Sequence, residues 1–412
     1  MTTVTEPTLT TELSEAARWD ADHVMTTYAR QKVEFERGEG CWLIDTEGNW
    51  YLDLLAGIAV CSVGHAHPRL TAAITEQATK LIHASNLYLT QPQAKLARRL
   101  MELSDFERVF FCNSGAEANE AAIKLSRKYG RGIRESKTKI VTALKSFHGR
   151  TLAAVTATGQ PKYNEPFAPL PPGFGYVPFN DLEALEAAID DDTCAVLLEP
   201  IQGESGVHPA TVEYLQKARE LCDKHGALLI FDEVQTGVGR TGRLWAYQQY
   251  GVTPDVMTLA KGLGGGVPIG ACLARGVAAE TLKPGDHGST FAGNPLATAA
   301  ANAVLDILAD ERLCDNARLV GQKLWLGFQK LAEKYPALIG APRGMGLMLG
   351  LDIKAPVAKE LVKRGLAHGL VLNATDDNTL RIVPPLTISA EEADEALTRL
   401  EAICSEMANS GE

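Results

Sequence analysis

Two neighbouring acids, Asp232 and Glu233, stand near the end of the apolar run "ALLIFDEV" (227–234) and just before a group of glycines. The run is typical of a buried strand, so both acids would lie at its carboxyl end. In parallel sheets this end is where ligands bind. A buried carboxylate there needs a cationic partner, because an unpaired buried charge is very costly. A protonated pyridine nitrogen of a bound ligand would supply that partner.

The glycines at positions 237, 239 and 242 have the G-x-G-x-x-G spacing of a dinucleotide-binding loop. Such a loop normally opens the first βαβ unit of a fold and places pyrophosphate at the start of the next helix. Here the loop lies past the middle of the chain, the two acids would repel a pyrophosphate, and "RLWAYQQYGV" is a poor helix start. We therefore expect the glycines to form a tight turn, with NAD binding as the alternative.

Three further features match the needs of a pyridine cofactor, pyridoxal phosphate, which requires an amine, an anion site and an apolar ring partner. Lys261 ends the apolar run "VMTLAK" (256–261), where burial would lower its pKa. The residues "SGAE" (114–117) have capping-box spacing, and the start of a helix can hold a phosphate. Phe147 in "SFHGRT" could cover the ring. Taken separately, a surface lysine, a plain helix cap and a core aromatic explain the same residues.

The elements that would position these residues follow an alternating pattern. Apolar runs at 108–112, 139–144, 195–200, 227–234, 256–261 and 270–274 are predicted strands, with helices between them at 116–129 and 211–225. This alternation predicts a mostly parallel sheet covered on both faces. Beyond about residue 313, long helices are predicted at 315–334, 355–368 and 390–407, around short strands.

The 412 residues are enough for two or three domains. We expect a flexible tail at 1–15 and an N-terminal segment at 16–69 that packs with the small domain. A large α/β domain at 70–312 and a small α+β domain at 313–412 would follow.

Composition excludes several classes of partner. The formal net charge of -11 argues against nucleic-acid or anionic-membrane binding, which needs a basic face. The eight cysteines are scattered, as expected of reduced thiols in the cytoplasm. The N-terminus lacks the layout of a signal peptide, and no apolar run approaches the ~20 residues needed to cross a bilayer. We therefore expect a cytoplasmic protein.

From about Val33 to Leu386 the chain resembles the class-III (subgroup III) aminotransferases, which are fold-type I pyridoxal-phosphate enzymes. The motifs are "GIAVCSVGHAHP", "FFCNSGAEANEAA", "FHGRT", "LEPIQGESG", "FDEVQTGVGRTG", "TLAKGLGGG", "HGSTFAGNPLA" and "LRIVPPL". They are most similar to those of members that act on acetylornithine. The resemblance implies a homodimer with composite sites that moves the terminal amine of N-acetylornithine to 2-oxoglutarate, as in arginine biosynthesis.

Residue by residue, the resemblance makes Lys261 the Schiff-base lysine and proton shuttle. It implies that Asp232 pairs with the pyridine nitrogen and Gln235 with the phenolic oxygen of the cofactor. Val234 and Phe147 would cover the two ring faces.

The phosphate and the substrates have their own residues in this resemblance. Gly115 and Ala116 would hold the phosphate, with Thr290 reaching it from the neighbouring subunit, and Ser289 would lie beside the substrate. Arg150 would take a donor carboxylate, and Arg381 the α-carboxylate of 2-oxoglutarate. Glu204 would mask Arg381 while the donor is bound.

Some residues depart from the family pattern. Cys61 stands where acetylornithine enzymes commonly have asparagine. Ile58 stands where ornithine enzymes have tyrosine, which favours an acylated donor or 4-aminobutyrate. His65 and His67 could suggest a metal site, but no further ligand at a usual spacing supports it, so we expect a structural loop and no metal.

Three alternatives stay open at this stage. Another ω-amine could be the donor: succinylornithine, 4-aminobutyrate, ornithine or a carrier-linked lysine precursor. The chain could instead be an NAD-dependent oxidoreductase. It could also bind the cofactor without catalysis, although such a protein has no need of Lys261.

Overall fold

The computed structural model describes residues 14–410. The tail predicted at 1–15 therefore lies outside the described residues, except for its last two positions. The first helix, α1 (Glu15–His23), begins with Ser14, whose hydroxyl accepts a hydrogen bond from the Ala17 N–H.

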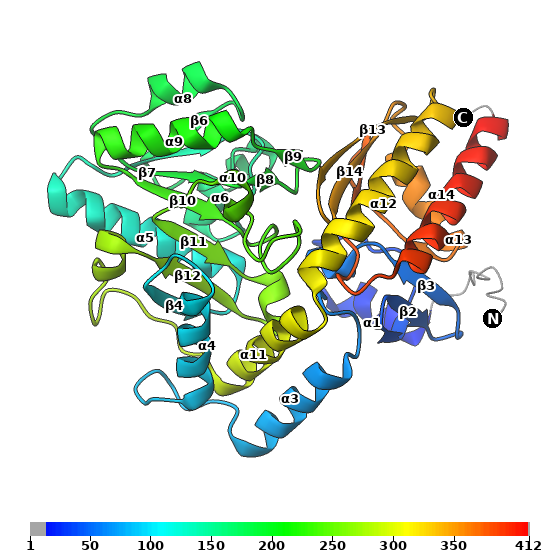
Figure 1. The fold of residues 1–412 in the computed structure, drawn as a ribbon, viewed down its shortest axis with the longest axis horizontal. Coiled ribbons are helices and arrows are strands. Elements are labelled where there is room, and N and C mark those ends of the chain that lie inside the picture. Colours follow the sequence, from blue (N-terminus) through cyan, green and yellow to red (C-terminus); the bar gives the residue numbers. More distant parts are fainter. Residues whose placement is uncertain (1–13, 411–412) are drawn as a thin grey trace.

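A seven-stranded sheet forms the left half of Figure 1. Its strands, in spatial order, are β4 (Arg108–Cys112), β12 (Gly270–Ala274), β11 (Val256–Leu259), β10 (Leu228–Asp232), β7 (Thr193–Leu198), β5 (Lys139–Ala143) and β6 (Phe174–Val177). β12 runs antiparallel to both of its neighbours, and the other pairs are parallel. The prediction of a mostly parallel sheet is confirmed, with β12 as the exception.

Two helices show how the sheet is covered on both faces. Leu229 and Phe231 of β10 share a core with residues of α9 (Val212–His225). Leu228 and Ile230, which alternate with them, share a second core with residues of α5 (Gly115–Ile133). Because successive side chains of a strand point to opposite faces, α9 and α5 cover opposite faces. This explains why β7 and β10 are buried along their whole length and mostly apolar.

The chain between residues 56 and 310 forms eight further α-helices. They are α2 (Ala56–Ala59), α3 (Pro68–Lys80), α4 (Gln91–Glu102), α6 (Leu152–Ala157), α7 (Pro161–Asn164), α8 (Leu182–Ala188), α10 (Tyr247–Tyr250) and α11 (Pro295–Asp310). A short antiparallel pair, β8 (Ile201–Gln202) and β9 (His208–Pro209), follows β7.

The other half of the molecule contains two smaller sheets. Helices α12 (Leu313–Lys334), α13 (Ala358–Ala367) and α14 (Ala390–Ser410) lie beside an antiparallel sheet of β13 (Ile339–Met345), β14 (Met348–Ile353), β17 (Thr379–Ile382) and β16 (Asn373–Asp376). The strands β1 (Phe35–Glu39), β2 (Trp42–Asp45) and β3 (Trp50–Asp53) form a sheet with β15 (Leu370–Val371). Segments from both ends of the chain thus share one sheet. The domain boundaries at residues 69 and 312 stay a prediction.

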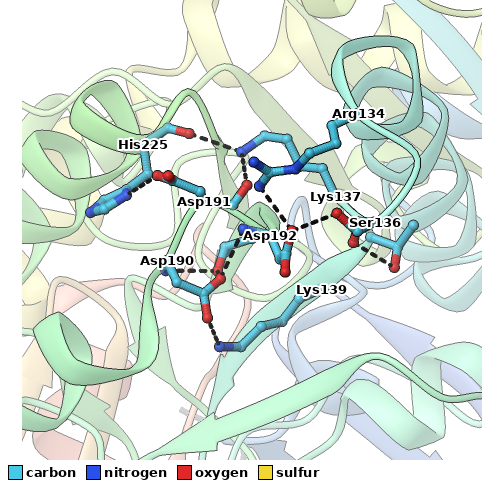
Figure 2. A network of polar contacts seen from close by, with 10 residues as sticks. Arg134, Ser136, Lys137, Lys139, Asp190, Asp191, Asp192 and His225 are labelled. Atoms are coloured by element: carbon cyan, nitrogen blue, oxygen red, sulfur yellow. Dashed lines mark hydrogen bonds and ion pairs between the residues drawn. The ribbon is translucent and has the colours of Figure 1, made fainter.

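A polar network fastens the amino ends of β5 and β7 (Figure 2). The Lys139 ammonium pairs with Asp190 at 2.8 Å, and the Arg134 guanidinium pairs with Asp192 at 2.8 Å. Lys137, which is buried, donates to the carbonyl oxygen of His225 at 2.8 Å. This network lies at the edge of the sheet opposite to the strand ends that hold Asp232.

Across residues 14–410, no helix is both long and apolar enough to span a membrane.

Candidate active site

A cavity of about 410 Å³ lies where the parallel strands end. β10 ends at Asp232, and β7 ends one residue before Glu199. Lys261 follows the end of β11, and α5 begins at Gly115, after the two residues that follow β4. All four residues line the cavity. Parallel strands bring them together because their carboxyl ends meet at one edge of the sheet.

Most of the residues predicted for the site line this cavity. They are Gly115, Ala116, Phe147, Arg150, Glu204, Asp232, Val234, Gln235 and Lys261. Arg381, Ser289 and Thr290 are not part of the lining that this chain forms.

Asp232 is held by three N–H donors at the floor of the cavity. Its Oδ2 accepts hydrogen bonds from Asn119 Nδ2 at 2.7 Å and from His148 Nδ1 at 2.8 Å. Its Oδ1 accepts from the Val234 N–H at 3.0 Å. Asn119 is itself fixed, because its Oδ1 accepts from the Thr258 hydroxyl at 2.8 Å. The carboxylate is therefore held in one orientation, with the cavity beside it for a cationic partner.

Glu233, the neighbouring acid, belongs to the scaffold. Its side chain accepts hydrogen bonds from the N–H groups of Ala246 at 2.6 Å and Tyr247 at 2.8 Å, where α10 begins. It is fully buried, and burial raises the pKa of Glu233 to about 7. The strand alternation turns one acid to the cavity and the other into the protein.

Lys261 has the properties of a reactive amine. Burial lowers its pKa to about 8, and the nearby charge of Arg381 acts in the same direction. A larger share of the amine is therefore neutral near pH 7 than in an ordinary lysine, and the neutral form is the nucleophile and base. A Cβ at Gly262 would lie 2.3 Å from the Ser62 hydroxyl oxygen, so any larger residue there would require Ser62 to shift.

The start of α5 is suited to bind an anion and lies at the same cavity as Asp232. The Ser114 hydroxyl accepts from the Glu117 N–H at 3.2 Å, as a capping box requires, but Glu117 in turn accepts from the Asn113 N–H at 2.7 Å. The first N–H groups of a helix have no acceptor within it and favour anions. Gly115 also lets α5 approach Val234, because a Cβ at Gly115 would lie 2.7 Å from Val234 Cγ1.

Arg381 is buried and forms an ion pair with Glu204, the residue predicted to cover it. Its guanidinium donates to Glu204 Oε2 at 2.7 Å and to Asn373 Oδ1 at 2.8 Å. Burial opposes ionisation of Glu204, but the charge and hydrogen bond of Arg381 lower its pKa. Glu204 therefore stands between Arg381 and the cavity that it lines.

Arg150 has a different environment at the same cavity. Its side chain is exposed, and its guanidinium carbon lies 4.1 Å from the ring centre of Tyr163 and 5.6 Å from that of Phe147. Ser289 lies nearby in the fold and accepts from Asn113 Nδ2 at 3.0 Å. Thr290, the next residue, is exposed.

Comparison with known proteins identifies the family. The family model "Aminotransferase class-III" matches residues 25–404. The chain belongs to the class-III aminotransferases. This aminotransferase is 57% identical to the acetylornithine aminotransferase of Gloeobacter violaceus over 384 residues, which cover 92% of this chain and 95% of that protein.

Solved structures agree with this assignment. The N-acetylornithine aminotransferase of Stenotrophomonas maltophilia is 43% identical, with a TM-score of 0.81 and coverage of 93% of this chain and 98% of that one. An ornithine aminotransferase structure from Toxoplasma gondii, with pyridoxal phosphate partly occupying its active site, is 35% identical; its TM-score is 0.92, and the match covers 97% of this chain and 96% of that one. The predicted family, fold type and transaminase activity are confirmed.

The residues of the cavity fit pyridoxal phosphate, the cofactor of class-III aminotransferases. Asp232 offers a fixed carboxylate for the ring nitrogen, and α5 offers its first N–H groups for the phosphate. Phe147 and Val234 supply apolar surface for the ring, and Lys261 supplies the amine. Each need identified from the sequence is thus met within one cavity.

The glycine loop of this aminotransferase is not built for a dinucleotide. Gly239 and Gly242 have φ angles of 86° and 90°, which favour glycine, so the segment turns tightly as predicted. α10 begins only at Tyr247, and Glu233 already occupies the N–H groups at its start. A bound dinucleotide would therefore find no free helix start for its pyrophosphate.

The residues that depart from the family pattern lie in a strained segment. Ile58 has a φ of 67°, and Ala56 and Ala59 are also left-handed. Val60 from this segment lines the cavity, whereas Ile58 and Cys61 do not.

His65 and His67 of the same segment have structural partners. His65 Nε2 lies 2.7 Å from Asp53 Oδ2, and His67 Nδ1 accepts from the Arg69 N–H at the start of α3. Within residues 14–410, no group of three or more His, Cys, Asp or Glu residues could hold a metal ion.

Sequence reasoning missed several residues at or next to the site, among them Glu199, Asn119 and Tyr163. Glu199 follows the end of β7 in the motif "LEPIQGESG". An acid at the carboxyl end of an apolar strand is the signal that identified Asp232 on β10, and it could have identified Glu199 as well. Glu199 accepts a hydrogen bond from the Phe147 N–H at 3.1 Å, and burial raises its pKa. Asn119 and Tyr163 had no comparable signal, because their roles depend on tertiary contacts.

Proposed function

We propose that this aminotransferase moves the terminal amine of N2-acetyl-L-ornithine to 2-oxoglutarate and gives N-acetylglutamate 5-semialdehyde and glutamate. The central observation is that Lys261 and Asp232 line one cavity together with the start of α5. Relatives named acetylornithine aminotransferase, at 49–57% identity over most of the chain, support this choice of donor.

Each side chain of the cavity has a distinct task in this proposal. Pyridoxal phosphate, when bound, supplies the electron-withdrawing ring that allows a proton to leave the amine-bearing carbon of the donor. Lys261 Nζ takes that proton and returns it, which its lowered pKa favours. Asp232 holds the charge of the ring nitrogen, and Gln235 binds the phenolic oxygen. The N–H groups of Gly115 and Ala116 bind the phosphate.

The two substrates use different arginines. Arg150 takes the carboxylate of the donor, because its guanidinium is exposed at the cavity. Glu204 covers Arg381 during this half of the reaction. When 2-oxoglutarate enters, Glu204 moves aside and Arg381 takes the α-carboxylate through its planar pair of donors. Ser289 lies beside the substrate.

We further propose a homodimer in which Thr290 reaches the cofactor phosphate of the neighbouring subunit. An apolar surface next to Thr290 supports this. It consists of Leu81, Ile82, Leu87, Tyr88, Leu89 and Phe291, whose side chains are largely exposed. The two segments contact each other, because Asn86 Nδ2 donates to the Ala292 carbonyl oxygen at 2.7 Å. Many exposed apolar side chains on two contacting segments indicate a protein interface.

The donor is tested by a panel of amines with 2-oxoglutarate, followed by glutamate formation. N-acetylornithine should give the highest kcat/KM among N-acetylornithine, succinylornithine, ornithine and 4-aminobutyrate. A higher value for any of the others would reassign the donor and leave the enzyme class unchanged.

The dimer has a separate test. In sedimentation the wild type should be a dimer and Leu89→Asp a monomer. The variant should also bind the cofactor more weakly, because the partner's contribution to the phosphate site is lost. Leu319→Asp is a matched control, since Leu319 is an exposed leucine of α12 outside the proposed interface. A monomeric wild type would contradict the dimer.

A further inference from the structure

Arg150 lies over an aromatic surface that consists of Phe147 and Tyr163. Its guanidinium carbon is 4.1 Å from the ring centre of Tyr163. The two rings meet edge to face, with centres 6.0 Å apart and planes at 86°. Phe147 and Arg150 both line the cofactor cavity, and Tyr163 contacts both of them.

A stacked arginine keeps its donors available. In the stacked arrangement that a separation of 4.1 Å allows, the flat face of the guanidinium meets the ring, and its N–H groups lie in the plane and point outward. Stacking therefore fixes the plane of Arg150 without occupying the N–H groups that bind a carboxylate in a bidentate manner. An exposed arginine without such a surface would sample many rotamers and would lose more entropy on binding.

Tyr163 is itself held by the segment that contains Phe147. It belongs to α7, which is preceded by Gln160. Gln160 Nε2 donates to the carbonyl oxygen of Ser146 at 2.9 Å, and Asn164 Nδ2 donates to that of Thr158 at 3.1 Å. Gln160 and Asn164 are both buried. The ring of Tyr163 is thus placed by buried hydrogen bonds on both sides of it in the sequence.

We propose that Tyr163 is a specificity-determining residue that orients Arg150 toward the α-carboxylate of the donor. This inference rests on the proposed role of Arg150. Tyr163 acts through its ring and not through its hydroxyl, so it sets the preference for donors that bear a carboxylate next to the acylated nitrogen. Donors without that carboxylate gain nothing from it.

The test measures binding of two unreactive donor analogues to the cofactor-loaded enzyme by calorimetry. N-acetylnorvaline has the donor's α-carboxylate and lacks its terminal amine, and N-acetylnorvaline amide replaces the carboxylate with a neutral group. The variants are Tyr163→Phe, which keeps the ring, and Tyr163→Leu and Tyr163→Met, which remove it. Lys162→Gln is the matched control, because Lys162 contacts the same ring and its replacement leaves the ring in place.

The wild type should prefer the carboxylate analogue, and Tyr163→Phe and Lys162→Gln should keep that preference within about twofold. In Tyr163→Leu and Tyr163→Met the ratio of the two affinities should fall about 3- to 30-fold, which corresponds to the loss of one cation–π contact. Arg150→Ala should abolish the preference.

Several results would overturn the inference. These are an equal loss of both analogues in Tyr163→Leu, an unchanged preference in that variant, a loss in Tyr163→Phe, or a preference that survives in Arg150→Ala. A wild type without any preference would overturn it too. Turnover of N-acetylornithine is measured separately, so a failure of the proposed donor is distinguished from a failure of Tyr163.

Discussion

Two polar networks lie at opposite edges of the same seven-stranded sheet. At the carboxyl edge, Asp232, Asn119 and His148 are almost completely buried and are joined by hydrogen bonds of 2.7 to 2.8 Å. At the amino edge, Asp190 and Lys139 pair at 2.8 Å, but 55% and 32% of their side-chain surfaces remain exposed (Figure 2). Similar distances therefore occur in very different surroundings.

The difference lies in what each network can do. In a low-dielectric interior, each hydrogen bond is stronger, and an unmatched group is costly, so the buried network fixes one orientation of Asp232. At the surface, water screens the charges, and an ion pair contributes little. We therefore expect changes at the carboxyl edge to alter chemistry, and changes of the exposed Asp190–Lys139 pair at the amino edge to alter stability slightly and chemistry not at all.

The largest effect should come from Lys261→Ala. The variant should lose the visible absorbance of the lysine-bound cofactor and nearly all turnover, because no other amine replaces the nucleophile and base. Spectroscopy of the purified protein and an assay with N-acetylornithine measure both. Wild-type protein that stays colourless with added pyridoxal phosphate would contradict the assignment of the cavity.

The two adjacent acids give the next contrast. Asp232→Asn should still bind the cofactor but lower kcat by several orders of magnitude, because an opposite charge no longer favours the protonated ring nitrogen. Glu233→Gln should keep most of kcat and lose stability by about 1–3 kcal/mol, since its partners are backbone N–H groups in the protein interior. Parallel measurement of kcat and chemical denaturation separates the two. Equal losses of kcat would mean that the wrong acid has been assigned.

The two arginines should divide the half-reactions. Arg381→Ala should raise the requirement for 2-oxoglutarate about 30- to 150-fold, which is the effect of losing a charge-assisted hydrogen bond. Arg150→Ala should instead weaken donors that bear a carboxylate. Glu204→Ala should expose Arg381 and increase activity toward amines next to a carboxylate, such as that of glutamate. Rapid-mixing spectra of each half-reaction check this, and an effect of Arg381→Ala on the donor half alone would reverse the assignment.

Much of the fold was predictable because local patterns dominate it. The strands at 108–112 and 270–274 have the predicted bounds, and the helix at 212–225 differs by one residue from the prediction. The direction of β12 was not predictable from its apolar composition, because parallel and antiparallel buried strands have the same pattern. Its direction follows from the chain returning beside β11, which only the tertiary structure shows.

The site was predictable to a similar degree. Asp232, Lys261 and Gly115 stand at the ends or starts of predicted elements, so the topology alone brings them together. Asn119 and Tyr163 lie within helices, and nothing in the local sequence shows that they contact Asp232 and Arg150. The roles assigned to Thr290 and Ser289 stay predictions, because they depend on a second subunit and a bound substrate.

The smallest effect should come from Asp190→Asn at the amino edge. The variant keeps the oxygen that accepts from the Asp192 N–H at 3.0 Å and loses the charge and the second oxygen, which accepts from Lys139. The free energy of unfolding should fall by about 0–1 kcal/mol, and kcat should stay within twofold. The hydrogen bond from Lys139 lowers the pKa of Asp190, so its contribution is present above the ordinary carboxyl pKa and is lost as the pH falls through the lowered value. Denaturation at several pH values and at ~1 M salt, where the Debye length is about 3 Å, should bring wild type and variant together in acid and in salt. A tenfold loss of kcat would show instead that the amino edge positions Asp232 through the sheet, and the contrast between the two networks would then be wrong.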